Sequence, residues 1–261
     1  TGLVDACRPS REHVIGVDWG LYRTHALAHA TRGAIVAIPD YMNFQVEGEI
    51  QPYFISVAEG RVVLDAVRAA RETLARGDHS ARAAPGTFLA GYSQGGHAVF
   101  AAADLAGRYA PEIDIEGIIG YGPSTNVRNL FREWTVAAPL VTYAYATFYG
   151  EEQFDPSLIL ASRWLENLPQ DATSQCIGAI QRFYPLEPEP LYRESFAAAL
   201  LGDRLEAEYP RIAAVMERNN AGLSGHRLPV LILAGTDDIV VYPESQTEFV
   251  RELCARAELT C

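Results

Sequence analysis

The fold is decided by the stretch Thr87-Phe88-Leu89-Ala90-Gly91-Tyr92-Ser93-Gln94-Gly95-Gly96-His97-Ala98-Val99-Phe100. A short apolar run, typical of a buried strand, stops at Gly91, and an Ala-rich segment typical of a helix follows Ser93. Gly91-Tyr92-Ser93-Gln94-Gly95 has the form G-x-S-x-G, in which a serine lies on a strained strand-to-helix turn and needs small residues two positions before and after it. The flanking strand and helix favour a nucleophilic Ser93 over a chance match in an ordinary turn.

The composition excludes several classes of protein. The chain has 261 residues, enough for one α/β domain with an insertion, and a formal net charge of -12. We expect no nucleic-acid partner, because nucleic-acid binding requires a basic face. The chain has no apolar run of about 18 residues, and its first residues lack the basic and then apolar pattern of a signal peptide. These features predict a soluble protein or the mature form of an exported one.

The four cysteines are Cys7, Cys176, Cys254 and Cys261. They lie far apart and lack C-x-x-C spacing, so we expect neither a zinc site nor another cofactor. Two disulfides in an exported protein and buried free thiols both remain open.

The remaining chain alternates between strand and helix patterns. Apolar residues spaced by three and four predict an amphipathic helix from Val57 to Ala75, and the apolar run Ala34–Ile38 before Pro39 is typical of a buried parallel strand. The other expected elements are helices at 19–32, from Ser93 to about 109 and at 244–257, and strands before Gly91, at 115–121 and at 229–235. This alternation predicts a doubly wound, mainly parallel α/β sheet.

The alternation is lost between residues 124 and 224. We expect this segment to be an inserted, mostly helical cap over the carboxyl edge of the sheet, with residues 1–123 and 225–261 forming the core. The segment is rich in aromatic residues and contains prolines at 139, 156, 169, 185, 188 and 190. Its aromatic side chains could line an apolar substrate pocket or fill the cap's own core.

A serine nucleophile also requires a base and an acid that orients the base. In hydrolases with this turn, the chain order is serine, acid, histidine. Asp238 fits the acid, because Gly235-x-x-Asp238-x-x-Val241 puts its carboxylate at the end of a late strand. Asp237 is the alternative if the turn shifts by one residue, and either aspartate could instead cap a loop.

Further motifs extend over nearly the whole chain. They are Thr1-Gly2 to Cys7-Arg8-Pro9-Ser10, Ile38-Pro39-Asp40-Tyr41, Val57 to Arg71, Gly91 to Ala98, Tyr109-Ala110-Pro111-Glu112 and Gly235 to Cys254. Together with the serine motif they resemble the secretory lipase family, the lipase A type of α/β-hydrolase. The resemblance implies an α/β-hydrolase fold and a secreted carboxylic ester hydrolase of lipid degradation, which acts on acylglycerols or similar apolar esters and contacts a lipid–water interface.

The resemblance also implies roles for individual residues. Ser93 matches the family's nucleophile, Asp238 its acid, and the backbone amides of Asp40 and Gln94 its oxyanion hole. It further implies a disulfide between Cys7 and Cys176 that joins the core to the cap.

The chain departs from the family at both ends. In the family the catalytic histidine follows one more strand after the helix at 244–257, but no histidine follows His226 here. The start resembles the tail of a motif that normally follows three strands. We therefore expect these 261 residues to be the middle of a longer protein, truncated at both ends.

The histidines in the chain are expected to have other roles. His97 lies four residues after Ser93, so it should face packing or solvent rather than act as the base. His25 and His29 could share a metal, but no third ligand is apparent, and a solvated helix face is the commoner arrangement. We expect His13, His79 and His226 to lie on the surface.

Two other functions remain open. Peptidases of the prolyl oligopeptidase type use the same serine turn and the same chain order. A hydrolase-fold protein that binds a ligand or partner without catalysis would account for the absent base. The aromatic cap favours the hydrolysis of apolar esters over both.

Overall fold

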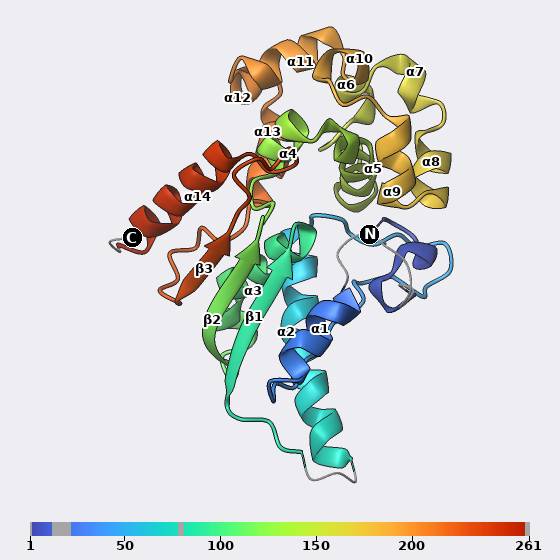
Figure 1. Ribbon diagram of the computed structural model, residues 1–261. Coiled ribbons are helices and arrows are strands. Elements are labelled where there is room, and N and C mark those ends of the chain that lie inside the picture. The colour runs from blue at the N-terminus through green and yellow to red at the C-terminus, as the bar shows by residue number, and fades with distance from the viewer. Residues whose placement is uncertain (1, 12–21, 78–80, 259–261) are drawn as a thin grey trace.

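The computed structural model describes residues 2–11, 22–77 and 81–258. Within these ranges, strands β1 (Gly86–Tyr92), β2 (Asp114–Tyr121) and β3 (Val230–Leu233) form a parallel sheet in the order β1-β2-β3 (Figure 1). Tyr92 at the end of β1 is paired with Tyr121 of β2, which is paired with Leu233 of β3. The carboxyl ends of the three strands therefore lie at one edge of the sheet.

Helices lie on both faces of this sheet. They are α1 (Tyr22–Ala30), α2 (Ser56–Arg76), α3 (Gln94–Tyr109) and α14 (Pro243–Arg256). Leu64 of α2, Phe100 of α3 and Phe249 of α14 share a buried cluster with Ile118 of β2. Tyr121 projects from the opposite face, because side chains alternate along a strand, and its ring lies 5.2 Å from that of His25 on α1. The predicted α/β fold with a parallel sheet is confirmed.

The predicted strand Ala34–Ile38 is wrong. The run is irregular, and no described strand pairs with it. Its apolar side chains are exposed, with Ile35 at 48% and Ile38 at 44%. A strand needs hydrogen bonds to a neighbouring strand, and here a cavity lined by both segments lies between the run and β1.

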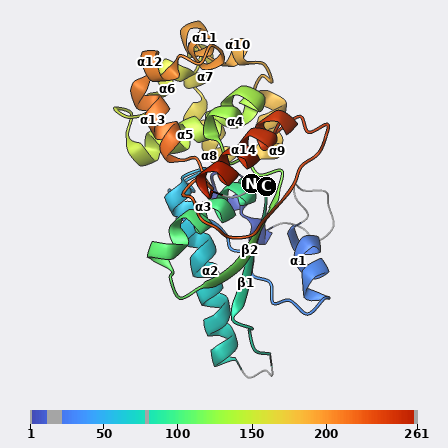
Figure 2. The same cartoon turned by 90° about the vertical axis from the view of Figure 1, so that its left-hand side faces the viewer.

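A helical layer lies over the carboxyl ends of the strands, as two views of the molecule agree (Figures 1 and 2). Its elements are α4 (Val127–Glu133), η3 (Thr135–Ala137), α5 (Ala138–Tyr149), α6 (Pro156–Ile159), α7 (Ser162–Leu165), α8 (Leu168–Ser174), α9 (Ile177–Phe183), α10 (Pro188–Leu191), α11 (Glu194–Leu201), α12 (Leu205–Glu208) and α13 (Pro210–Arg218). Prolines at the first or second position begin several of these helices, including α5, α6 and α10. Proline is favoured there because the first helical N–H groups have no intrahelical acceptor. The boundaries of the cap at residues 124 and 224 stay a prediction.

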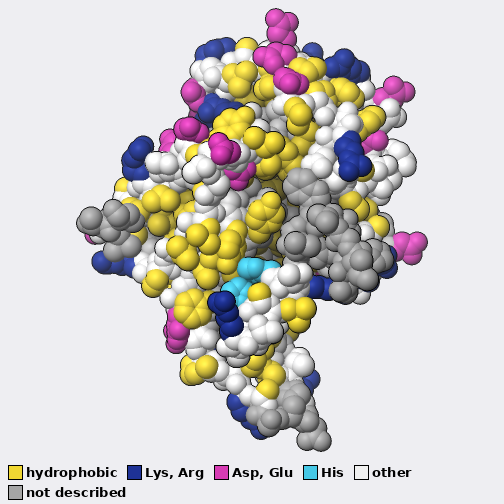
Figure 3. Space-filling model, in the orientation of Figure 1, with side chains coloured by type: hydrophobic (Ala, Val, Ile, Leu, Met, Phe, Trp, Pro, Cys, Tyr) yellow, Lys and Arg dark blue, Asp and Glu magenta, His cyan; other side chains and the backbone are white. Residues whose placement is uncertain are grey.

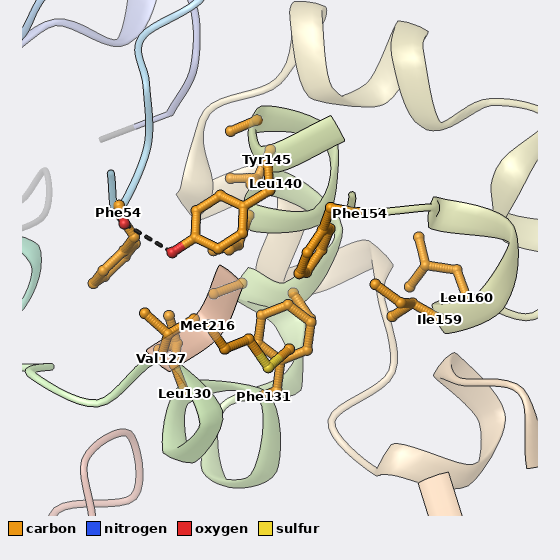
Figure 4. Close-up of a cluster of buried hydrophobic side chains, with 14 of the residues drawn as sticks. Phe54, Val127, Leu130, Phe131, Leu140, Tyr145, Phe154, Ile159, Leu160 and Met216 are labelled. Carbon is orange, nitrogen blue, oxygen red and sulfur yellow. Dashed lines mark hydrogen bonds between the residues drawn. The ribbon is translucent and has the colours of Figure 1, made fainter. Parts of the chain in front are cut away.

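Most of the large aromatic side chains in this layer fill its own core. Phe131, Tyr145, Phe154 and Phe196 are fully buried in one cluster. Figure 4 shows Tyr145 pointing toward Phe54, and its hydroxyl donates a hydrogen bond of 2.8 Å to the Phe54 carbonyl. For these four residues, the expectation that cap aromatics fill the cap's own core is confirmed.

A disulfide joins the two layers. Cys7 and Cys176 are bonded, with 5.5 Å between their Cα atoms, as the family resemblance implied. Gly2 forms a β-bridge with Cys176, and a Cβ atom on Gly2 would lie only 2.7 Å from Cys7 Sγ. Cys254 is also disulfide-bonded, so free thiols are wrong for these three cysteines, while Cys261 lies outside the described residues. No helix in the described part of the chain is both long and apolar enough for a membrane span.

Candidate active site

Ser93 lies in the strained turn that the motif predicts. It stands between the end of β1 and the start of α3, with φ 51° and ψ -113°. A non-glycine residue with this backbone is unfavourable unless its surroundings hold it. The Ser93 N–H donates to the carbonyl of Tyr121 at 3.0 Å, and its carbonyl accepts from the N–H groups of His97 and Ser124 at 3.1 and 3.2 Å. These bonds to α3 and to the end of β2 hold the turn.

The small residues around this turn are only partly those predicted. A Cβ atom on Gly91 would lie 2.0 Å from the carbonyl oxygen of Gly95, so glycine is required at 91. A Cβ atom on Gly95 would meet nothing within 4 Å, so the steric requirement predicted there is wrong. The second crowded position is Gly96, where a Cβ atom would lie 2.5 Å from Pro123 Cβ. This constraint at Gly96 arises because the start of α3 lies close to the residues that follow β2. Gly96 lies outside the five-residue motif Gly91–Gly95, so the motif does not predict it.

Asp238 lies at the carboxyl edge of the sheet after β3. Its Oδ1 accepts from the N–H groups of Val240 and Val241 at 2.9 and 3.1 Å. Its Oδ2 would lie 3.3 Å from a Cβ atom on Gly122, which follows β2. The pKa of Tyr92 is raised, first by burial and then by the Asp238 carboxylate. One oxygen therefore caps the turn while the other faces the end of β2.

Asp237 differs from Asp238 in its environment. Its side chain is exposed, and its Oδ2 lies 3.4 Å from the neighbouring Thr236 hydroxyl. Asp238 is partly buried. The geometry favours Asp238 over Asp237 as the acid, and this role stays a prediction.

The two predicted oxyanion residues are held by different parts of the chain. The Asp40 carboxylate accepts from the backbone N–H and the hydroxyl of Ser10, at 2.8 and 2.5 Å, and pairs with Arg8 at 4.0 Å. Gln94 is the first residue of α3. The first N–H groups of a helix have no intrahelical acceptor and carry partial positive charge. The N–H of Gln94 thus has the chemistry of an oxyanion donor.

His97 is committed to two partners away from Ser93. It is fully buried, with Nδ1 2.6 Å from Glu59 Oε2 and Nε2 2.7 Å from the Asn219 carbonyl. Of the two environments predicted for His97, packing and solvent, the structure shows packing. The sequence analysis did not identify Glu59, the partner of His97. Its position could have indicated a buried role, because it is an acidic residue on the apolar face of the helix predicted from Val57.

The other histidines divide into three groups. The rings of His25 and His29 lie 4.7 Å apart, and the pKa of His25 is lowered, first by burial and then by His29. No group of three potential metal ligands occurs among the described residues. His226 is not the surface residue predicted, because both of its ring nitrogens are buried without a described partner and burial lowers its pKa. His13 and His79 lie outside the described residues.

A cavity of about 830 Å³ opens beside Ser93. It runs along the edge of β1 to which no described strand is paired. Ser93, Gln94 and Gly95 line one end, and apolar residues of α2 and of the run 34–38 line the rest. Of the described cap residues, Trp134 and Ile177 line it. Figure 3 shows histidine side chains on the face that Figure 1 views, with apolar side chains to one side of them and a basic side chain below them. The walls therefore come mainly from the core rather than from the cap.

A parallel sheet with helices on both faces and a strained serine between strand and helix defines an α/β-hydrolase fold. A family model described as secretory lipase matches residues 14–257. The chain therefore belongs to the secretory lipase family.

Solved structures with the same fold include three hydrolases. The rice cell wall degrading esterase LipA from Xanthomonas oryzae is 19% identical, with a TM-score of 0.66 over 79% of this chain and 57% of its own. Candida antarctica lipase A is 20% identical, with a TM-score of 0.66 over 98% of this chain and 60% of its own. A putative hydrolase from Legionella pneumophila is 15% identical, with a TM-score of 0.73 over 98% and 71%.

The chain spans somewhat more than half the length of the LipA and lipase A structures. A comparison with curated protein sequences found no match.

Proposed function

We propose that this chain carries the nucleophile of a carboxylic ester hydrolase that acts on apolar acyl esters, triacylglycerols among them. The observation that carries the proposal is Ser93, held at φ 51° in a strand-to-helix turn at the end of a largely apolar cavity. Membership of the secretory lipase family supports ester hydrolysis. A cavity with apolar walls suits an acyl chain, because each buried methylene contributes about 0.8 kcal/mol.

The proposed reaction proceeds through an acyl-enzyme. The Ser93 Oγ attacks the ester carbonyl while an imidazole base accepts its proton, and the base then returns the proton to the leaving alkoxide. The N–H groups of Gln94 and Asp40 stabilise the oxyanion, an effect of about 3 kcal/mol for one donor. Asp238 orients the base. His97 is not that base, because its Nε2 donates to Asn219 and its Nδ1 faces Glu59.

We also infer that the protein is exported. Three of its cysteines are disulfide-bonded, and disulfides persist in oxidising compartments. The family description supports the same inference.

The test uses the full-length protein and a series of p-nitrophenyl esters of increasing acyl length, with a p-nitroanilide as the amide control. We expect preference for apolar chains, weak amide cleavage, and covalent labelling of Ser93 by a fluorophosphonate. Ser93→Ala should lose both turnover and labelling. Amide cleavage faster than ester cleavage would favour the peptidase alternative, and absence of turnover and labelling would favour a binding protein.

A further inference from the structure

A buried polar cluster lies beneath the serine turn. Its members are Glu59 of α2, and Gln94 and His97 of α3, whose side chains are 1%, 7% and 0% exposed. Buried ionisable groups are costly unless they are paired and hydrogen-bonded. No step of the proposed reaction uses Glu59 or His97, so their burial beside the nucleophile calls for another explanation.

The Glu59 carboxylate is the centre of the cluster. Its Oε1 accepts from the side-chain amide of Gln94 at 2.7 Å and from the Phe54 N–H at 2.9 Å. Its Oε2 lies 2.6 Å from Nδ1 of His97. One carboxylate thus joins α2 to the first turn of α3.

The number of protons on the His97–Glu59 pair follows from the partner of His97 Nε2, which is the Asn219 carbonyl. A carbonyl oxygen only accepts, so His97 Nε2 must carry a proton that it donates to Asn219 at 2.7 Å. Glu59 and Nδ1 then share one further proton at 2.6 Å. With that proton the pair is neutral overall, which reduces the cost of burying it.

Asn219 follows α13, at the end of the helical layer, and connects the cluster to three helices. Its Oδ1 accepts from the Ser56 N–H at 3.1 Å and from the Tyr149 hydroxyl at 3.0 Å, and its Nδ2 donates to the Val215 carbonyl at 2.9 Å. These partners belong to α2, α5 and α13. The imidazole of His97 is therefore held by a residue whose side chain three hydrogen bonds keep in place.

The cluster ends at the residue that matters for the proposed reaction. Gln94 supplies one of the two proposed oxyanion N–H groups, and its side-chain amide donates to Glu59. Gln51 Oε1 lies 3.3 Å from the same Gln94 Nε2. Holding the side chain fixes the Gln94 Cα, and thereby the direction of its N–H. Oxyanion donors are effective because they are oriented before the reaction begins.

We propose that Glu59 and His97 are positioning residues, which hold Gln94 so that its backbone N–H points at the developing oxyanion. The proposal rests on the proposed function. If Glu59 and His97 were only buried packing residues, they would stabilise the fold, and their replacement would not change the turnover rate.

The test compares two substitutions at Glu59 in the full-length protein. Glu59→Leu removes the nearer of the two acceptors of the Gln94 side chain and leaves Gln51 Oε1 at 3.3 Å, whereas Glu59→Gln can accept from Gln94 and donate to a neutral His97. Loss of an oxyanion donor costs about 10² to 10³ in rate, and misdirection of one should cost less. We expect Glu59→Leu to lower kcat about 10-fold to 100-fold with KM changed by less than about twofold, and Glu59→Gln to restore kcat to within about threefold of the wild type.

Tyr149→Phe is the matched control. It removes one hydrogen bond from the same cluster, at Asn219 Oδ1, and leaves Gln94 and Glu59 untouched. We expect a lower Tm and an unchanged kcat. If Glu59→Leu does not fold, Gln94→Met replaces it, because this change removes the donor to Glu59 and retains the backbone N–H.

Amide hydrogen exchange over residues 91–97 provides a readout that needs no substrate. We expect about tenfold faster exchange in Glu59→Leu than in the wild type, and no change in Tyr149→Phe. Equal kcat and equal exchange in Glu59→Leu and Tyr149→Phe would overturn the proposal. An inactive wild type with faster exchange in Glu59→Leu would refute ester hydrolysis and leave the positioning of Gln94 supported.

Discussion

Replacement of Gly91 by alanine should disable the serine turn. The new Cβ atom would lie 2.0 Å from the Gly95 carbonyl oxygen, 2.2 Å from its carbonyl carbon and 2.6 Å from the Gly96 nitrogen. All three are backbone atoms of the α3 start, so no side chain can rotate away. Since contacts below 3.0 Å essentially never occur for a Cβ atom, β1 and α3 must separate by about 1 Å.

This displacement has two measurable consequences. Overpacking against backbone costs about 3 kcal/mol, which corresponds to a Tm lower by about 6–12 °C for a chain of this size. A 1 Å misplacement at the reacting atoms costs about 10² in rate, so fluorophosphonate labelling of Ser93 should slow about 100-fold. Differential scanning calorimetry and a labelling time course measure both effects on the same sample.

Gly107 supplies the control for this substitution. It lies in α3, the helix whose first residues the Gly91 substitution would strike, and a Cβ atom on Gly107 would meet nothing within 4 Å. Gly107→Ala should raise the Tm by about 2–4 °C, because alanine is favoured over glycine by about 1 kcal/mol in a helix, and should label at the wild-type rate. If Gly91→Ala keeps its Tm within about 2 °C and its labelling rate within about threefold, the steric reasoning is refuted.

Three further predictions concern other parts of the molecule. Cys7→Ser with Cys176→Ser should lower the free energy of unfolding by about 2–5 kcal/mol, measured by urea denaturation, and added reductant should then change the variant less than the wild type. Trp134→Ala should change acyl-length preference because Trp134 lines the cavity, whereas Phe154→Ala should destabilise the cap core by about 3–5 kcal/mol without changing preference; equal preference in both variants would contradict a role for the cap in the pocket. Burial raises the pKa of Glu133, although its hydrogen bonds to Ser245 and Tyr242 lower it. Protonation of this carboxyl therefore stabilises the folded state at pH values below the pKa that Glu133 has in the unfolded chain. That stabilisation is lost as the pH rises through the pKa that Glu133 has in the folded protein. Glu133→Gln should thus be more stable than the wild type at pH 7, with the Tm difference closing toward pH 4, and a difference that widens on acidification would show the sign to be wrong.

The local pattern of the sequence determined the elements around the nucleophile. The apolar run before Gly91, the serine and the following Ala-rich segment predicted β1, the strained turn and α3 correctly. These elements depend on backbone conformation and on neighbours within a few residues, so the sequence contains the information directly. The prolines of the cap and the amphipathic pattern of α2 were informative for the same reason.

Contacts between distant segments decided the rest. The run Ala34–Ile38 has the composition of a buried strand, yet it lies apart from β1 and exposes its apolar side chains. Gly96 is constrained by Pro123, which no local pattern indicates. The local pattern shows Glu59 only as an acidic residue on an apolar helix face, and does not show that it meets His97 and Gln94. Strand pairing and buried charge pairs depend on which surfaces the fold brings together. A pattern along the chain therefore predicts that a segment is apolar or that a carboxylate has an unusual position. Only the tertiary structure decides which residues that segment or carboxylate contacts.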